Sequence, residues 1–286
     1  MASLSGCAWL SAKQSELALR PTPGRPPAFA SDTAGLRPGD LRFTAPVAQA
    51  GATPHVLALW WLPHADPQAP TLLYLHGTFR NLYLNLPKID ALREAGFSVV
   101  AVDYRGWGDS TPIVPSEASI NADVQLAWAE LQRRQPSPGR RVIFGHSMGS
   151  AVAVTLASSL QHGTDYGALA LESAFTRMPD IAAEAGFWGR VAAALTTLEF
   201  DSLARIKRVD APILMLHGDA DRTVPLVLGQ RLRDAAPPGV QWVQVPGGSH
   251  SWMHRDTPDI YRRAFTDLMK AAAIAPAATP VPVPPP

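Results

Sequence analysis

The feature that most constrains the fold is an alternation of short apolar runs with helix-length segments, which extends from residue 41 to residue 272. Each apolar run has the length of a strand, and most are bounded by Gly, Pro or Asp, which interrupt regular structure. Strands that are apolar on both faces and separated by helices predict an α/β protein with a parallel sheet covered on both sides. The expected strands are 56–62, 71–75, 97–102, 141–144, 168–171, 212–216 and 241–245, with a further edge strand at 41–46.

The two ends of the chain do not share this alternation. Proline is concentrated there, and because proline donates no backbone hydrogen bond, it disfavours helices and sheets. We therefore expect a flexible N-terminal tail over 1–40, one domain over 41–272 and a Pro-rich disordered tail over 273–286. Residues 177–210 interrupt the alternation within the domain and predict a short helical insertion.

Charge and hydropathy exclude several classes of protein. Lys and Arg total 25 against 24 Asp and Glu, so the chain has no strongly basic field to hold nucleic acid. No apolar run approaches the ~18 residues needed to cross a bilayer, so we expect no transmembrane span. We expect no cofactor, because neither Gly-x-Gly-x-x-Gly nor Gly-x4-Gly-Lys-Ser/Thr occurs, and no metal, because no ligand cluster stands out.

The single cysteine, Cys7, ends a Leu-Ser-Gly-Cys tetrapeptide that resembles a bacterial lipobox. Only six residues precede it, without the basic and apolar regions of a signal peptide. Two interpretations stay open. If the true start lies upstream, Cys7 carries a lipid anchor and the protein is a cell-envelope lipoprotein. If the match is a coincidence, the protein is cytoplasmic.

A candidate nucleophile lies between the strand 141–144 and a helix-compatible run that begins at Ser150. The intervening pentapeptide, Gly-His-Ser-Met-Gly, places Ser147 in a strand–turn–helix setting. Such a sharp turn projects the serine hydroxyl above the sheet, and side chains at the two glycines would collide with neighbouring backbone. The following helix N-terminus also favours developing negative charge. The sequence therefore predicts Ser147 as a nucleophile.

Two turns further along the chain supply candidates for an acid and a base. Asp219 and Asp221 follow the strand 212–216, and His250 follows the strand 241–245. A serine hydroxyl needs a base to accept its proton, and α/β sheets place active sites just past their strand ends. The residues alone leave Asp219 and Asp221 as competing acids.

These motifs resemble the α/β-hydrolase superfamily, in its esterase, lipase and serine-aminopeptidase-like branch of short-cap acyl hydrolases. Residues 103–110 look like that family's Asp-Tyr-Arg-Gly-x-Gly-x-Ser turn, and the resemblance covers nearly all of 41–272. It implies a mostly parallel eight-stranded sheet with a short helical cap. The family's His-Gly-x-x-Asp-x-x-Val-Pro pattern aligns with 217–225 and selects Asp221, which leaves Asp219 as a turn residue. Its Gly-x-x-His pattern selects His250.

Alternatives remain for these roles. Glu172 is a third candidate acid, because some family members place the acid after the corresponding strand, and His254 is an alternative base. The oxyanion hole is expected to use the amide of Met148, the residue after the nucleophile. The resemblance implies the amide of Thr78 as the second donor, or that of Phe79 in a shifted register.

The expected function is hydrolysis of a carboxylic ester or thioester, including lipid-like esters, through a Ser-His-Asp triad. An amidase or serine aminopeptidase is the alternative, and it needs an acidic anchor for the substrate amine, such as Glu172 or Glu184. A non-catalytic binding protein on the same fold is a third hypothesis, because fold alone does not establish function. That hypothesis predicts a broken triad, and the sequence shows no break.

Overall fold

One eight-stranded sheet forms the centre of the computed structural model, which describes residues 2–48, 54–184, 186, 187, 191, 193, 194 and 196–275. The strand order is β1-β2-β4-β3-β5-β6-β7-β8. β2 runs antiparallel to both neighbours, and every other adjacent pair is parallel. The expected mostly parallel eight-stranded sheet is therefore confirmed. The strands are β1 (Leu41–Val47), β2 (His55–Leu62), β3 (Thr71–Leu75), β4 (Ser98–Asp103), β5 (Arg141–His146), β6 (Ala168–Glu172), β7 (Ile213–Gly218) and β8 (Gln241–Val245).

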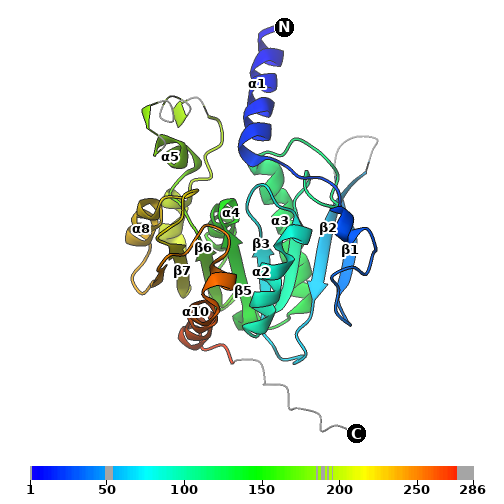
Figure 1. The fold of residues 1–286 in the computed structure, drawn as a ribbon, viewed down its shortest axis with the longest axis vertical. Coiled ribbons are helices and arrows are strands. Elements are labelled where there is room, and N and C mark those ends of the chain that lie inside the picture. Colours follow the sequence, from blue (N-terminus) through cyan, green and yellow to red (C-terminus); the bar gives the residue numbers. More distant parts are fainter. Residues whose placement is uncertain are drawn as a thin grey trace.

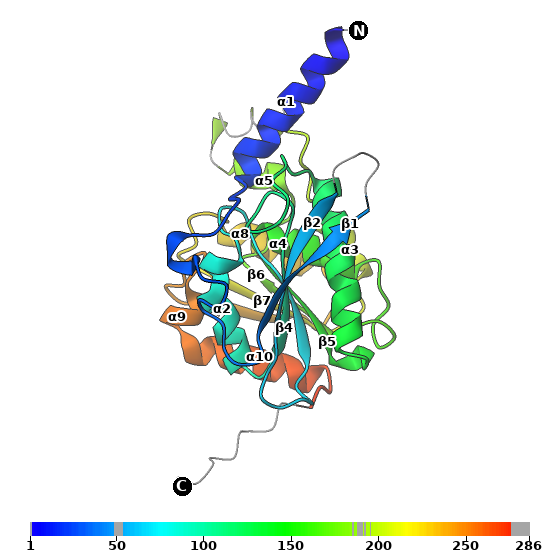
Figure 2. The same ribbon diagram turned by 90° about the vertical axis from the view of Figure 1, so that its right-hand side faces the viewer.

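Helices cover both faces of the sheet (Figures 1 and 2). The central strands are buried along their whole length, so successive side chains of β3 enter opposite cores. Leu72 and Tyr74 join the core beneath α2 and α10, whereas Leu73 and Leu75 join the core beneath α3, α4 and α8. The helices of the domain are α2 (Leu82–Glu94), α3 (Glu117–Arg134), α4 (Met148–Ala157), α5 (Met178–Ala183), α7 (Ser202–Arg205), α8 (Leu226–Ala235), α9 (Met253–Asp256) and α10 (Pro258–Ala271).

The N-terminal segment differs from the flexible tail expected over 1–40. It begins with the helix α1 (Ala2–Leu19), which stands at the same end of the molecule as α5 (Figures 1 and 2). The chain after α1 is hydrogen-bonded to the domain, because Gly24 donates to the carbonyl of Gly108 at 2.7 Å and Gly108 donates to that of Thr22 at 3.0 Å. Arg25 adds an ion pair with Asp109 at 2.9 Å. These contacts order a segment whose proline content suggested disorder.

The expected insertion over 177–210 contains α5, α7 and a 3-10 turn at Ile206–Arg208. Leu198 and Phe200, near its end, are buried against the main core. Most of the expected disordered tail, residues 276–286, lies outside the described residues. Among the described residues, no helix combines the length and the apolar character needed to cross a bilayer.

Candidate active site

Ser147 occupies the sharp turn between β5 and α4. Its backbone has φ 56° and ψ −123°, a conformation that residues other than glycine seldom adopt. The turn is held by its neighbours, because the Ser147 amide donates to the carbonyl of Glu172 at 2.9 Å and the Ser150 hydroxyl donates to the Ser147 carbonyl at 2.6 Å. Strained backbone of this kind persists only where the surrounding structure enforces it, and it is frequent at functional sites.

The two motif glycines allow this turn to form. A Cβ at Gly145 would lie 2.2 Å from the carbonyl oxygen of Gly149. A Cβ at Gly149 would lie 2.1 Å from the carbonyl oxygen of Leu75, which belongs to the neighbouring strand β3. Both contacts are to backbone, which cannot move aside as a side chain would. The pentapeptide therefore meets a steric requirement of the turn as well as carrying the serine.

Asp221 and His250 meet directly, although 29 positions separate them in the chain. Asp221 Oδ2 lies 2.8 Å from His250 Nδ1, and Asp221 Oδ1 accepts the amides of Thr223 and Val224 at 2.9 and 2.8 Å. Burial alone would raise the pKa of Asp221, but the hydrogen bond and charge of His250, with the two amides, hold it below its usual value. A neutral His250 that donates from Nδ1 keeps Nε2 as a proton acceptor.

The described residues include no hydrogen bond between the Ser147 hydroxyl and the His250 ring. The loop of His250 nevertheless lies beside the nucleophile turn, because His146 Nε2 donates to the His250 carbonyl at 2.8 Å. Ser173 donates to the same carbonyl at 3.3 Å. The structure thus brings Asp221 and His250, the candidate acid and base, together, and it shows no contact between His250 and Ser147 among the described residues. Contacts of this kind are often long in ligand-free sites.

The alternative candidates have other partners. Asp219 is exposed and accepts the amide of Gly247 at 2.7 Å, which is the turn-forming role. His254 is buried between Trp252 and Tyr261, and neither of its ring nitrogens has a hydrogen-bond partner among the described residues. Burial, followed by the charge of Lys88, lowers the pKa of His254 to about 3. No carboxylate among the described residues accepts a hydrogen bond from His254, as a catalytic base would require.

Glu172 belongs to a separate buried network. Its carboxylate pairs with the ammonium of Lys88 from α2 and accepts the hydroxyl of Tyr261 from α10 at 2.9 Å. Its side chain is fully buried, and Lys88 is 3% exposed. Burial lowers the pKa of Lys88, and the Glu172 charge opposes that shift. Glu172 therefore satisfies its charge through Lys88 rather than through His250.

The two expected oxyanion donors lie on the wall of one cavity with Ser147. Met148 is the first residue of α4, so its amide has no carbonyl four residues earlier within the helix. The Met148 and Thr78 amides donate no hydrogen bond to another group within the described part of the chain. The Phe79 amide is equally unbonded there, and its backbone φ is 67°. The geometry thus keeps Thr78 and Phe79 as alternatives.

Three buried histidines tie the loops of the site in place. His76 Nδ1 donates to the Gly77 carbonyl at 2.6 Å, and His217 Nε2 donates to the Val224 carbonyl at 2.9 Å. His146 makes the corresponding bond to the loop of His250. Burial lowers the pKa of each, and that of His76 falls to about 4, so all three are neutral donors near pH 7. Their places beside motif glycines in the sequence reflect this anchoring.

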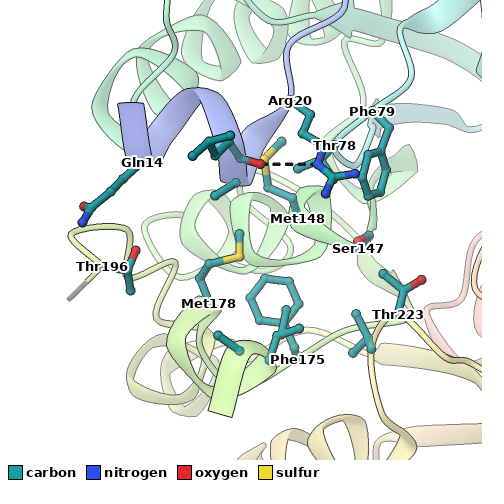
Figure 3. A pocket seen from close by; sticks show the side chains of 15 residues that line it. Gln14, Arg20, Thr78, Phe79, Ser147, Met148, Phe175, Met178, Thr196 and Thr223 are labelled. Atoms are coloured by element: carbon teal, nitrogen blue, oxygen red, sulfur yellow. Dashed lines mark hydrogen bonds between the residues drawn. The ribbon is translucent and has the colours of Figure 1, made fainter. Parts of the chain in front are cut away.

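A cavity of about 740 Å³ adjoins Ser147 (Figure 3). The insertion contributes Met178, Ile181 and Ala182 to its wall, and Phe175 and Val224 add further apolar surface. No Asp or Glu lines the cavity among the described residues. This size and apolar lining are typical of pockets for small molecules.

One wall of the cavity was missed by the sequence analysis. Gln14, Leu17, Ala18 and Arg20 line it from α1 and the residue after that helix. A weak signal was present, because residues 8–19 contain neither Gly nor Pro and suit a helix. Because a proline-rich stretch follows, the whole segment was predicted to be part of the flexible tail.

Comparison with known proteins gives consistent results. Residues 66–200 match the family model described as serine aminopeptidase, S33. The chain is 34% identical over 194 residues to the uncharacterized protein Rv2307c of Mycobacterium tuberculosis. The aligned region covers 67% of each of the two chains. It is 32% identical over 194 residues to lysophosphatidylserine lipase ABHD12 of Danio rerio, which covers 63% of this chain and 50% of that one.

Solved structures extend the comparison to the fold. The esterase Pf2001 of Pyrococcus furiosus superposes with a TM-score of 0.66 at 16% identity, over 87% of this chain and 96% of that one. At this identity the likeness concerns the fold alone. The matched sequences, the eight-stranded sheet and the serine turn after β5 lead to one assignment. The chain belongs to the α/β-hydrolase superfamily.

Proposed function

We propose that this protein is a serine hydrolase that cleaves a carboxylic ester or thioester through an acyl-enzyme. The observation that carries the proposal is the 2.8 Å contact between Asp221 and His250, whose loop is bonded to the residue before Ser147. The apolar cavity beside Ser147 supplies room for an acyl group. The names of two similar proteins, an esterase and a lysophosphatidylserine lipase, agree with a lipid-like ester.

In this mechanism His250 Nε2 accepts the hydroxyl proton as Ser147 Oγ attacks the acyl carbonyl. Asp221 remains ionised, orients the imidazole and stabilises its cation. The amides of Met148 and Thr78 donate to the oxyanion, and each such donor contributes about 3–4 kcal/mol to the lowered barrier. His250 then protonates the leaving alcohol or thiol. A water molecule, deprotonated by His250, attacks the acyl-enzyme and releases the carboxylic acid.

The cavity favours an ester over an amine-bearing substrate. An aminopeptidase needs a carboxylate near the substrate amine, and none lines the cavity among the described residues. The two acids suggested by the sequence are engaged elsewhere, because Glu172 pairs with Lys88 and Glu184 pairs with Arg231 at 3.3 Å. Because of this charge arrangement, we propose the esterase first and keep the peptidase as the second hypothesis.

The test combines covalent labelling with turnover. Purified wild type, Ser147→Ala and Ser158→Ala are treated with a fluorescent fluorophosphonate and assayed on p-nitrophenyl esters from acetyl to palmitoyl. Ser158 is the matched control, because it lies just after α4 and its hydroxyl donates only to the Thr155 carbonyl. We expect labelling and turnover in wild type and Ser158→Ala, and neither in Ser147→Ala.

Three results would contradict the proposal. Labelling that persists in Ser147→Ala would place the nucleophile elsewhere. A wild type that is labelled and inactive on every ester, but cleaves aminoacyl p-nitroanilides, would favour the peptidase. Failure on both substrate classes would favour a binding protein on this fold.

Lipid attachment at Cys7 is a separate proposal. Cys7 falls within α1, the helix that also contributes a wall of the cavity. An anchor at this position would hold the cavity near a membrane surface. Expression of the gene with its upstream sequence, followed by mass spectrometry of the purified protein, tests it. A thioether-linked diacylglycerol on Cys7 would support the anchor, and an unmodified Cys7 would contradict it.

A further inference from the structure

We infer that Arg20 selects acyl substrates that carry an anionic group, a phosphate or a carboxylate, at the α1 side of the cavity. This inference rests on the proposed function, because it concerns the substrate of the same site. Arg20 is the only charged side chain among the described residues that line the cavity. The other lining side chains are apolar or uncharged, so any charge on a bound molecule would interact mainly with this guanidinium.

The guanidinium of Arg20 retains donors for a ligand. Its Nε donates to the Leu17 carbonyl at 3.3 Å, and it makes no ion pair within the described part of the chain. The neighbouring Arg25, in contrast, is paired with Asp32 and Asp109. A planar guanidinium with free N–H groups matches the two oxygens of a carboxylate or phosphate.

Arg20 lies on the side of the cavity formed by the loop of Thr78 and Phe79. Its guanidinium lies over the ring of Phe79, 5.1 Å from the centroid, and Phe79 adjoins Thr78 in the oxyanion loop. Figure 3 shows Arg20 and Phe79 together, away from Met178 and Phe175. An acyl chain along Met178 and Phe175 would therefore leave the other part of the substrate facing Arg20.

The backbone at Arg20 has a conformation that is unusual for arginine. Arg20 follows the last residue of α1 with φ 47°, a position where glycine or asparagine is usual. A simpler explanation is that the cation caps the helix C-terminus, as its bond to the Leu17 carbonyl suggests. Capping stabilises the helix but does not distinguish one substrate from another. Substrate selectivity therefore separates the two explanations.

The experiment compares three esters with the same octanoyl chain: monooctanoylglycerol, its phosphate and its hemisuccinate. We measure kcat/KM for wild type, Arg20→Gln, Arg20→Lys and Arg20→Gly. Arg20→Gly removes the guanidinium and suits the backbone conformation, so it controls for strain. Lys13→Gln is the matched surface control, because Lys13 lies on α1, pairs with Glu16 at 2.7 Å and does not line the cavity.

We expect wild type to prefer at least one anionic ester. Because Arg20 is exposed, Arg20→Gln and Arg20→Gly should reduce the ratio of anionic to neutral kcat/KM by about two- to five-fold, the range of an exposed ion pair. Arg20→Lys should keep part of the preference, and Lys13→Gln should keep all of it. The phosphate and hemisuccinate arms show which anion is preferred.

An unchanged ratio in Arg20→Gln, or an equal reduction in Lys13→Gln, would overturn the inference. If no ester is hydrolysed, the proposed function fails, and the charge is tested by binding instead. Calorimetry with octyl phosphate and octanol on Ser147→Ala, with and without Arg20→Gln, measures the same preference. Tighter binding of octyl phosphate that depends on Arg20 would support the inference, and equal binding would refute it.

Discussion

Replacing Asp221 by asparagine should lower kcat for ester hydrolysis by about 10⁴-fold while the fold is retained, as expected for a triad whose acid loses its charge. The side-chain oxygen of the introduced asparagine can still accept the amides of Thr223 and Val224, which Asp221 Oδ1 accepts at 2.9 and 2.8 Å. The new amide nitrogen would then face His250 Nδ1, which in the wild type lies 2.8 Å from Asp221 Oδ2. Two N–H groups cannot bond each other, so His250 must carry its proton on Nε2.

This tautomer removes the acceptor for the Ser147 proton, and the imidazolium formed during attack loses its counter-charge. A 10⁴-fold loss corresponds to about 5.4 kcal/mol, at about 1.36 kcal/mol for each factor of ten. The side chain of Asp221 is fully buried, so water does not replace the lost charge. The structure thus predicts a large effect on kcat and a small one on KM.

Asp219→Asn is the matched control, because Asp219 lies two positions away and its carboxylate bonds, within the described part of the chain, only the amide of Gly247. We expect its kcat to stay within about threefold of wild type, because Asp219 is exposed and His250 bonds Asp221 instead. Both variants are assayed on one p-nitrophenyl ester, with thermal melting to confirm folding. A tenth or more of wild-type kcat in folded Asp221→Asn, or an equal loss in Asp219→Asn, would refute the assignment of the acid.

Lys88→Met should reduce the free energy of unfolding by about 3–5 kcal/mol, because it leaves the Glu172 carboxylate buried without its cation, and adding Glu172→Leu should restore part of it. A urea titration that shows no recovery in the double variant would contradict this. Gly149→Ala should lower the melting temperature by several degrees, because its Cβ would lie 2.1 Å from the Leu75 carbonyl oxygen; an unchanged melt would contradict the packing. The pKa of His254 is lowered to about 3, so the unfolded state binds more protons between that pH and about 6.5. Stability should therefore fall as pH drops through this range, and His254→Leu should flatten the dependence of the urea midpoint on pH.

The strands were predictable because each one is recognised from its own short stretch of sequence. The run predicted at 241–245 coincides with β8 (Gln241–Val245), and the run predicted at 97–102 differs from β4 (Ser98–Asp103) by one residue. Continuous burial on both faces makes each strand an uninterrupted apolar run between turn residues. The candidate acid and base followed from the same logic, because each lies in a turn directly after a strand.

Features that depend on contacts between distant segments were not predictable in this way. Lys88 and Glu172 are separated by 84 positions and no motif links them, so nothing in the sequence marks them as partners. The contribution of α1 to the cavity depends on how that helix meets the insertion. Local composition reports whether a helix forms but not what it packs against.

The candidate catalytic residues and part of the cavity wall come from different segments of the chain. The candidate nucleophile, acid and base come from turns after β5, β7 and β8, whereas part of the wall comes from α1, before the first strand. Changes in α1 would alter the space and charge offered to a bound molecule without moving the strands that hold these candidate residues. Substrate range can therefore diverge among relatives through the N-terminal helix alone while the chemistry stays the same. For engineering, α1 is the segment to randomise when a new substrate is sought.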